Sequence, residues 1–227
     1  MGFWIFVFIA VLLLGLLLYW ELIIAEGTHL GPRIVVGLYD LIASRYERIK
    51  NFKLDLDDNY IGWPLTVKLA EVDQPRVIDV AAGTGRAARS LLRQVAFDGA
   101  VVNLELSVKM MSIGQRLVAP WPGRTSWLRG PADRLPFADN TFDAVTCLEA
   151  LEFFPNPSGA MAESVRVLRP GGWLVVTNRV GLSARFLVGK TFTRAAFRGL
   201  LAGLPLEAVR VEPWQVEYDL AWARKKI

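Results

Sequence analysis

From Arg76 onward the chain alternates between short apolar runs and amphipathic segments, and this alternation restricts the possible folds more than any other feature. We expect strands in "RVIDVAA", "AVVNLEL", "RTSWLRG", "FDAVTCL" and "GWLVVTN", with helices such as "GRAARSLLRQVA" and "SGAMAESVRVL" between most of them. Strands that alternate with helices form parallel sheets covered on both faces. The sequence therefore predicts an α/β fold with a doubly wound sheet.

The last two apolar runs differ from the others because no helix separates them. "LEAVRVE" and "WQVEYDLAWA" are joined only through Pro213, and a link this short cannot cross over to make a parallel pair. We expect a seven-stranded sheet, mostly parallel with an antiparallel last strand. In the second run Val216, Tyr218, Leu220 and Trp222 alternate with other residues, which predicts a strand buried on one face.

The N-terminus carries a continuous apolar run. Every residue from Phe3 to Trp20 is apolar or aromatic except Gly15, and a helix of this length roughly matches a hydrocarbon core about 30 Å thick. A cleaved signal peptide is the rival interpretation, but no basic region precedes the run and "IIAEGT" is a poor cleavage site. We expect a transmembrane anchor at 1–26, a juxtamembrane helix and linker at 27–58, and the main domain at 59–227.

Charge around this run predicts its orientation. No Lys or Arg precedes it, whereas several follow it: Arg33, Arg45, Arg48, Lys50 and Lys53. The positive-inside rule then places the main domain on the cytoplasmic side of a single-pass protein. The only cysteine, Cys147, and the only histidine, His29, exclude a disulfide framework and a Cys/His metal site.

Residues 33–52 read as an amphipathic helix. Val35, Leu38, Ile42, Tyr46 and Ile49 recur at steps of three and four residues, as on one face of a helix. The polar side, with its two arginines and one lysine, suits contact with anionic lipid headgroups. An ordinary solvated face fits the same pattern, and the sequence leaves both interpretations open.

A glycine loop follows the first expected strand. In "DVAAGTGRAAR", Gly83, Gly85 and Ala88 fit G-x-G-x-x-A, and Glu105 ends the second strand twenty residues after Gly85. Such a loop lets the backbone approach a ligand, and a carboxylate at that distance can accept both ribose hydroxyls. These features predict a nucleoside site without separating NAD from other nucleosides. Asp79 favours a cationic ligand, since its carboxylate would repel a pyrophosphate.

Three motifs occur in order: "DVAAGTG", "LPFADNTFD" and "VLRPGG". Together they resemble the class I S-adenosylmethionine-dependent methyltransferases, and most closely the subgroup with the ubiquinone/menaquinone-biosynthesis C-methyltransferases. The resemblance covers residues 76–180 strongly and 181–227 weakly. It implies a Rossmann-like sheet and S-adenosylmethionine as cofactor. "YDLIASRY" resembles the segment that folds over the cofactor in that subgroup.

The resemblance also implies roles for single residues. Asp79, Ala81 and Gly83 would surround the methionine part of the cofactor, and Gly85 would start the next helix. Glu105 would bind the ribose. Met110 would pack on the adenine, and the Ala132 amide would meet an adenine nitrogen. The remaining expected cofactor contacts are Leu106, Asp133, and Tyr39 and Tyr46 from the covering segment.

Two positions depart from the family pattern. Ala81 replaces a frequent glycine, which we expect to be tolerated because alanine is small. Pro131 stands where many relatives have an Asp or Asn that holds the adenine amino group. Proline offers neither a side-chain acceptor nor an amide donor. Asp133 could compensate, or be a surface charge.

Substrate contacts are expected from "CLEALEFFPNP" and from the helix around Tyr39 and Tyr46. Glu152 is the first candidate for a general base and Glu149 the second, although Glu152 also fits a solvated loop carboxylate. The sequence thus predicts a membrane-anchored methyltransferase acting on a small or lipid-like acceptor. Besides that acceptor we expect the lipid bilayer as a partner, and neither nucleic acid nor metal. The alternatives are a degenerate methyltransferase fold that only binds, and an NAD-dependent oxidoreductase.

Overall fold

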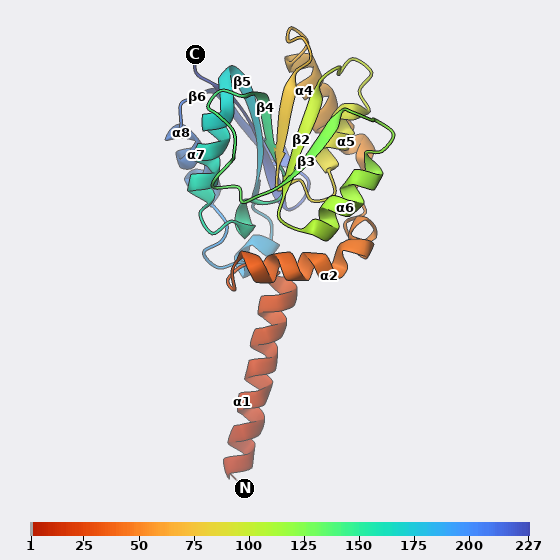
Figure 1. Cartoon of the computed structure of the whole chain (residues 1–227). Coiled ribbons are helices and arrows are strands. Elements are labelled where there is room, and N and C mark those ends of the chain that lie inside the picture. Colours follow the sequence, from red (N-terminus) through yellow and green to blue (C-terminus); the bar gives the residue numbers. More distant parts are fainter. Residues whose placement is uncertain (1) are drawn as a thin grey trace.

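The computed structural model describes residues 2–227, and it centres on one seven-stranded sheet (Figure 1). The strand order is β3-β2-β1-β4-β5-β7-β6, with parallel pairing throughout except at β7, which is antiparallel to both its neighbours. The predicted doubly wound, mostly parallel sheet is confirmed. The strands are β1 (Arg76–Val80), β2 (Ala100–Glu105), β3 (Thr125–Arg129), β4 (Phe142–Cys147), β5 (Leu168–Arg179), β6 (Leu206–Trp214) and β7 (Tyr218–Lys225).

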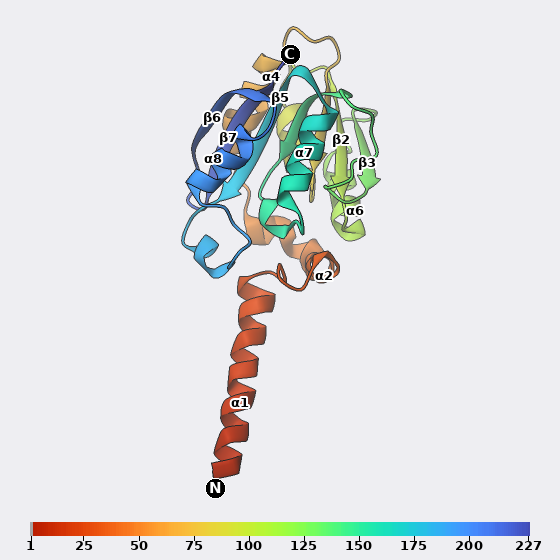
Figure 2. The ribbon, with the colours of Figure 1, turned by 90° about the vertical axis from the view of Figure 1, so that its left-hand side faces the viewer.

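Helices cover both faces of the sheet. On one face lie α7 (Pro157–Val167) and α8 (Arg194–Ala202), which stand in front of the strands in Figure 2. On the other lie α4 (Trp63–Lys68) and α5 (Arg86–Leu92), preceded by the short α3 (Leu54–Asp57) and the π-helical turn η2 (Asp58–Gly62). Helix α6 (Val108–Leu117) connects β2 to β3, and the 3-10 turns η3 (Leu151–Phe153) and η4 (Ser183–Phe186) follow β4 and β5.

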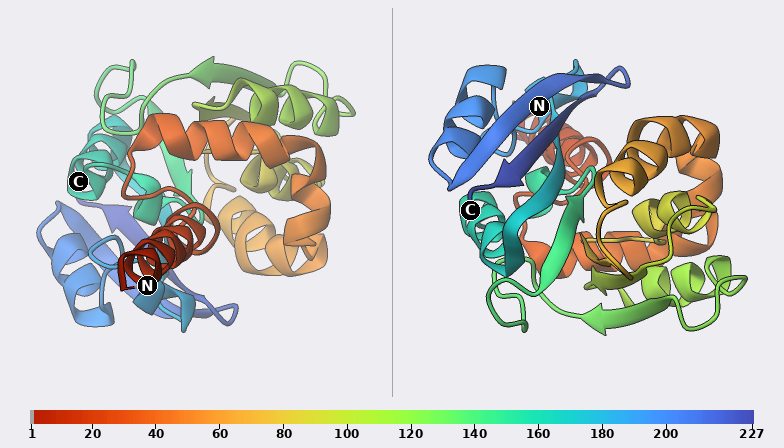
Figure 3. Two further views of the ribbon diagram at one scale, coloured as in Figure 1. Left: turned by 90° about the horizontal axis from the view of Figure 1, so that it is seen from below. Right: turned by 90° about the horizontal axis from the view of Figure 1, so that it is seen from above.

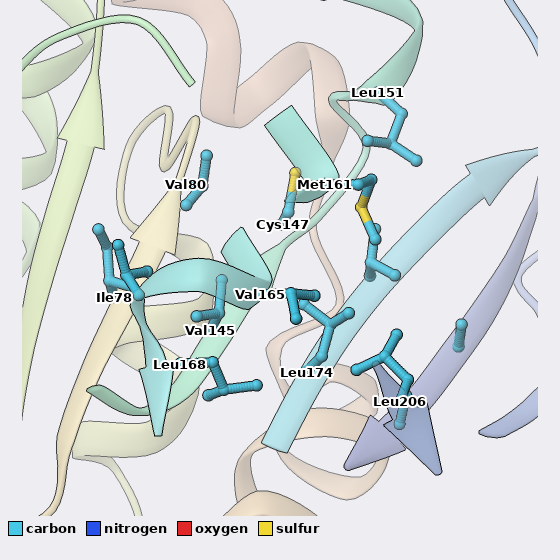
Figure 4. Packing of buried hydrophobic residues seen from close by; sticks show 14 of the residues in the cluster. Ile78, Val80, Val145, Cys147, Leu151, Met161, Val165, Leu168, Leu174 and Leu206 are labelled. Atoms are coloured by element: carbon cyan, nitrogen blue, oxygen red, sulfur yellow. The ribbon is translucent and has the colours of Figure 1, made fainter. Parts of the chain in front are cut away.

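The larger core lies between the sheet and α7 (Figure 4). Ile78 of β1 and Val145 of β4 meet Met161 and Val165 of α7, and all four side chains are at most 3% exposed. Burial of such apolar side chains is the main favourable contribution to folding. This packing makes the central strands a rigid base for the loops at their ends.

Strand β7 corrects one expectation. Val216 was expected to lie in a strand buried on one face, but it is 89% exposed in the turn before β7. Residues 218–223 are instead buried on both faces. The cause is tertiary packing: β7 lies inside the sheet between β5 and β6, and a core covers each of its faces, with Ala221 and Ala223 in one core and Leu220 and Trp222 in the other. The segment "RPGG" lies within β5, which begins at Leu168 and contains Gly171 with φ +77°.

The apolar N-terminus forms one long helix that leaves the domain (Figure 1). Helix α1 (Gly2–Tyr19) continues into the π-helical turn η1 (Trp20–Ile24), and none of the residues of α1 is buried. Within residues 2–227 this is the one helix whose length and mean hydropathy of 2.6 would allow it to cross a membrane.

Helix α2 (Pro32–Lys50) lies across the carboxyl edge of the sheet, as the view from below in Figure 3 shows. Gly31, with φ +91°, and Pro32 begin it, and Asn51 ends it in the left-handed region, which is typical helix-terminus chemistry. Its acidic side chains fix it to the domain. Asp40 accepts a hydrogen bond from the Ser107 hydroxyl, and Glu47 pairs with Arg89 at 2.9 Å.

Candidate functional site

A cavity of about 610 Å³ lies between α2 and the carboxyl ends of β1 to β4. Its walls come from the segments that follow these strands, at 81–84, 105–107, 129–133 and 148–150, and from the inner face of α2. In parallel sheets ligands bind at this edge, where loops from several strands converge. Helix α2 therefore covers the place where a ligand is expected.

The loop after β1 forms one wall of the cavity. Ala81 and Gly83 adopt φ values of +57° and +56°, and the Ala82 amide donates to the Leu104 carbonyl at 3.0 Å. The left-handed conformation costs a residue with a Cβ about 1–2 kcal/mol. Ala81 therefore carries a backbone cost, and its small size is not what decides whether alanine is tolerated here.

Glu105 is held with its carboxylate at the cavity wall. Oε2 accepts from the Gly83 amide at 2.8 Å, and Oε1 accepts from the Leu106 and Ser107 amides at 2.9 and 2.8 Å. Burial raises the pKa of Glu105, and the three amide donors partly offset that rise. A carboxylate has about four lone-pair positions. At least one remains to accept a hydroxyl from the cavity.

Asp79 lies at the floor of the cavity, at the end of β1. Its side chain is 2% exposed, and Oδ1 accepts a hydrogen bond from the Thr146 hydroxyl at 2.6 Å. No Lys, Arg or His within residues 2–227 forms an ion pair with it. Burial raises its pKa to about 7. A buried carboxylate without a cationic partner favours a ligand that brings positive charge.

Arg86, at the start of α5, was not anticipated as a site residue. Its guanidinium makes two hydrogen bonds to Asp57, at 2.7 and 2.6 Å, and one to Glu149. It also lies 4.4 Å from the centroid of the Phe52 ring. Asp57 is fully buried. The sequence carried no signal for this pair because its members are 29 residues apart.

Aromatic rings from α2 line the same cavity as Asp79. Tyr39 and Tyr46 have ring centroids 5.8 Å apart, and each contacts a further ring: Phe153 at 5.6 Å and Phe52 at 5.7 Å. The Tyr39 hydroxyl donates to Glu26 at 2.8 Å. Burial raises the pKa of both tyrosines. Both rings line the cavity.

The structure brings nearly all the predicted cofactor residues to this cavity. Ten of them line it: Tyr39, Tyr46, Asp79, Ala81, Gly83, Glu105, Leu106, Met110, Ala132 and Asp133. Gly85 does not, and it begins α5 with φ +79°, packed near Trp127. Pro131 also lines the cavity. The expected substrate loop contributes Phe153 and Phe154 to the cavity.

The two candidate bases are placed differently. Glu149 lines the cavity, with its carboxylate beside Arg86 and 3.6 Å from the Lys50 ammonium. Glu152 does not line it: the side chain is 2% exposed, accepts from the Tyr218 hydroxyl at 2.7 Å, and lies 3.6 Å from Arg179. The solvated-loop interpretation of Glu152 is therefore wrong, because η3 turns its side chain inward. A catalytic role for either carboxylate stays a prediction.

These features fit S-adenosylmethionine. The cofactor carries an ammonium and a sulfonium that suit Asp79, and ribose hydroxyls that suit Glu105. Met110 supplies an apolar contact for a planar base, and its side chain is 1% exposed. Within residues 2–227, no group of three His, Cys, Asp or Glu side chains is placed to hold a metal ion.

Comparison with known proteins agrees with this geometry. Residues 78–176 match the family described as a methyltransferase domain. A demethylmenaquinone methyltransferase of Lactiplantibacillus plantarum is 34% identical over 143 residues, which are 62% of this chain and 60% of that protein. A ubiquinone/menaquinone biosynthesis C-methyltransferase of Geobacter sulfurreducens is 38% identical over 103 residues, covering 44% of this chain and 40% of that protein. Residues 78–176 are therefore similar in sequence to methyltransferase domains.

The fold of this chain is shared with solved structures. A putative sarcosine dimethylglycine methyltransferase from Galdieria sulphuraria superposes with a TM-score of 0.63 at 16% identity, covering 74% of this chain and 85% of that one. The sequence matches to the relatives span less than two thirds of their lengths. The family match favours a methyltransferase over the NAD-dependent oxidoreductase, and Asp79 facing the cavity agrees with it.

Proposed function

We propose that this protein transfers a methyl group from S-adenosylmethionine to a small, lipid-like acceptor at a membrane surface. The observation that carries the proposal is that Asp79, Glu105 and the aromatic side chains of α2 all line the same cavity. The first two suit the cofactor, and the aromatic side chains suit a flat, apolar acceptor.

S-adenosylmethionine, when bound, supplies a methyl group made electrophilic by the sulfonium. The protein's part is then mainly positioning, since holding two reactants in line contributes much of the acceleration of such a transfer. Tyr39 and Tyr46 would exclude water from that region and hold an apolar acceptor against the cofactor. Asp79 would balance the positive charge of the bound cofactor.

The class of acceptor rests on the relatives and on the wall of the cavity. The relatives' names refer to demethylmenaquinone and to ubiquinone and menaquinone biosynthesis, and we infer a quinone-like ring with an apolar tail as acceptor. Phe153, Phe154 and the two tyrosines supply a mostly apolar, aromatic wall for such a ring. If the ring must lose a proton, Glu149 is better placed than Glu152, because only Glu149 lines the cavity.

We also propose that α1 with η1 is a membrane anchor and that the domain lies on the cytoplasmic side. The 23-residue apolar helix supports the anchor, and the arginines that follow it support the orientation. Residues 27–58 then form a lid and linker, and 59–227 the methyltransferase domain.

The test is methyl transfer by the full-length protein in lipid nanodiscs. Methyl-labelled S-adenosylmethionine is supplied with a prenylated naphthoquinol that lacks a ring methyl group, and the label in the extracted lipid is counted. We expect labelled product, and much less of it from Glu105→Ala when the cofactor concentration is below saturation. A second arm replaces the prenylated acceptor with a short-chain analogue. Transfer to the soluble analogue alone would contradict the lipid-like acceptor.

A second function, a tethered module that only binds, has one observation in its favour. Pro131 lines the cavity where a relative would hold the adenine amino group. Calorimetric binding of S-adenosylhomocysteine without transfer to any quinol tested would favour this function. Absence of binding would contradict both functions.

A further inference from the structure

We propose that the outer face of α2, together with residues 182–188 around η4, docks flat on an anionic lipid bilayer. This docking surface consists of Arg33, Ile34, Leu41, Arg45, Arg48, Ile49, Leu182, Arg185, Phe186 and Val188, all of which are exposed. The inference rests on the proposed anchor only in that α1 brings this face close to lipid. It does not depend on methyl transfer.

On α2 and the connector before it, the acidic side chains bond to other groups of the protein, whereas arginines lie on the outward side. Each acidic residue there is engaged by the protein: Glu21 by His29, Glu26 by Tyr39, Asp40 by Ser107 and Glu47 by Arg89. The three arginines of the docking surface on α2 are exposed, and none has an ion-pair partner within residues 2–227. The charged side chains on the outward side of α2 are therefore all basic, which favours contact with an anionic surface.

Apolar side chains lie among these arginines. Ile34, Leu41 and Ile49 are 41%, 77% and 58% exposed, and they are seven and eight residues apart, close to two helical turns. The inner positions of the helix are already used for the cavity. A helix with a basic and apolar outer face is typical of segments that lie in the membrane interface.

The second part of the docking surface, residues 182–188, lies beside the connector that joins α1 to α2. Leu182, Phe186 and Val188 are 64%, 47% and 69% exposed. The connector is tied to this segment, because His29 donates from Nε2 to the Val188 carbonyl at 2.9 Å and stacks on Trp20 with centroids 5.2 Å apart. In the view from below (Figure 3), α2 and the segment around η4 flank the root of α1.

The position of the docking surface next to the proposed anchor indicates that a lipid bilayer, rather than another protein, covers it. Helix α1 leaves the domain from the side on which α2 lies (Figures 1 and 2). A bilayer spanned by α1 would meet that side first. Pro32 and Arg33 are exposed and also line the cavity, so the cavity reaches the surface at the start of α2. An acceptor dissolved in the bilayer would then enter without crossing water.

The experiment uses full-length protein in nanodiscs and an environment-sensitive fluorophore on one introduced cysteine. Leu41→Cys and Phe186→Cys report the two parts of the docking surface. Val95→Cys, at a fully exposed position in the loop after α5, reports the opposite edge of the sheet. Cys147 is buried, and the unsubstituted protein measures any labelling there. Quenching by spin-labelled lipid is compared with quenching by aqueous iodide.

We expect lipid quenching at positions 41 and 186 and iodide quenching at 95 on anionic nanodiscs. Each arginine near an anionic surface contributes roughly a fivefold change in affinity. Arg45→Gln with Arg48→Gln should therefore lower the ratio of docked to undocked protein about 25-fold, whereas the matched pair Arg116→Gln and Arg198→Gln should not. Equal iodide quenching at 41 and 95 would overturn the proposal. Protection of position 41 without lipid quenching would overturn it in favour of a protein partner or a second copy.

Discussion

Asp79 leads to the sharpest prediction, because its charge should make cofactor binding depend on pH. Its pKa is raised to about 7 by burial, so in the ligand-free protein the carboxyl is mostly protonated below that pH. The ionised form attracts the cationic methionine part of the cofactor. Binding below pH 7 must then release one proton, and each such proton changes affinity about tenfold per pH unit. Affinity should be near its maximum at pH 8, about half of it at pH 7 and about a tenth at pH 6.

The assay is calorimetric titration of the detergent-solubilised protein with S-adenosylhomocysteine between pH 6 and 8.5. This ligand is stable and retains the ammonium, and S-adenosylmethionine adds the sulfonium in a parallel series. Two buffers with different ionisation enthalpies count the protons released. Asp79→Asn should bind more weakly with a flat profile. An unchanged affinity from pH 6 to 8 in the parent, or the parent's slope in Asp79→Asn, would refute the assigned role of this carboxylate.

Four other outcomes follow from the same contacts. Because the folded pKa of Asp79 lies above its unfolded value, its contribution to stability is lost as pH rises from about 4 to about 7. Asp79→Asn should therefore stabilise the ligand-free protein at pH 8 by on the order of 4 kcal/mol in urea unfolding, since each unit of pKa shift corresponds to about 1.4 kcal/mol. Glu105→Ala should weaken S-adenosylhomocysteine binding by roughly 2–3 kcal/mol; unchanged calorimetric affinity would place the ribose elsewhere. Replacing Tyr39 and Tyr46 together with alanine should weaken the same binding by more than about 1 kcal/mol, and a smaller loss would contradict the lid. Removing residues 2–19 should leave a folded domain, since none of α1 is buried; a lower melting temperature by circular dichroism would count against this.

Much of the site could be predicted from the sequence because its parts are local. The glycine loop, Asp79 and Glu105 each stand at the end of an apolar run, and parallel strands bring such ends to one edge. The apolar N-terminal helix and the helix at 32–50 likewise follow from periodicity within short segments. These features depend on neighbours in the sequence, so one segment at a time is enough to recognise them.

Tertiary structure decided which way several side chains face and what they meet. Glu149 and Glu152 are one turn apart in the same loop, yet only Glu149 reaches the cavity, because η3 turns Glu152 toward Tyr218. Arg86 and Asp57 form their buried pair across 29 residues. The arginines of α2 face outward because Asp40 and Glu47 bind groups on the domain. Periodicity tells which face of a segment is apolar, but partners distant in sequence are chosen only when the elements pack.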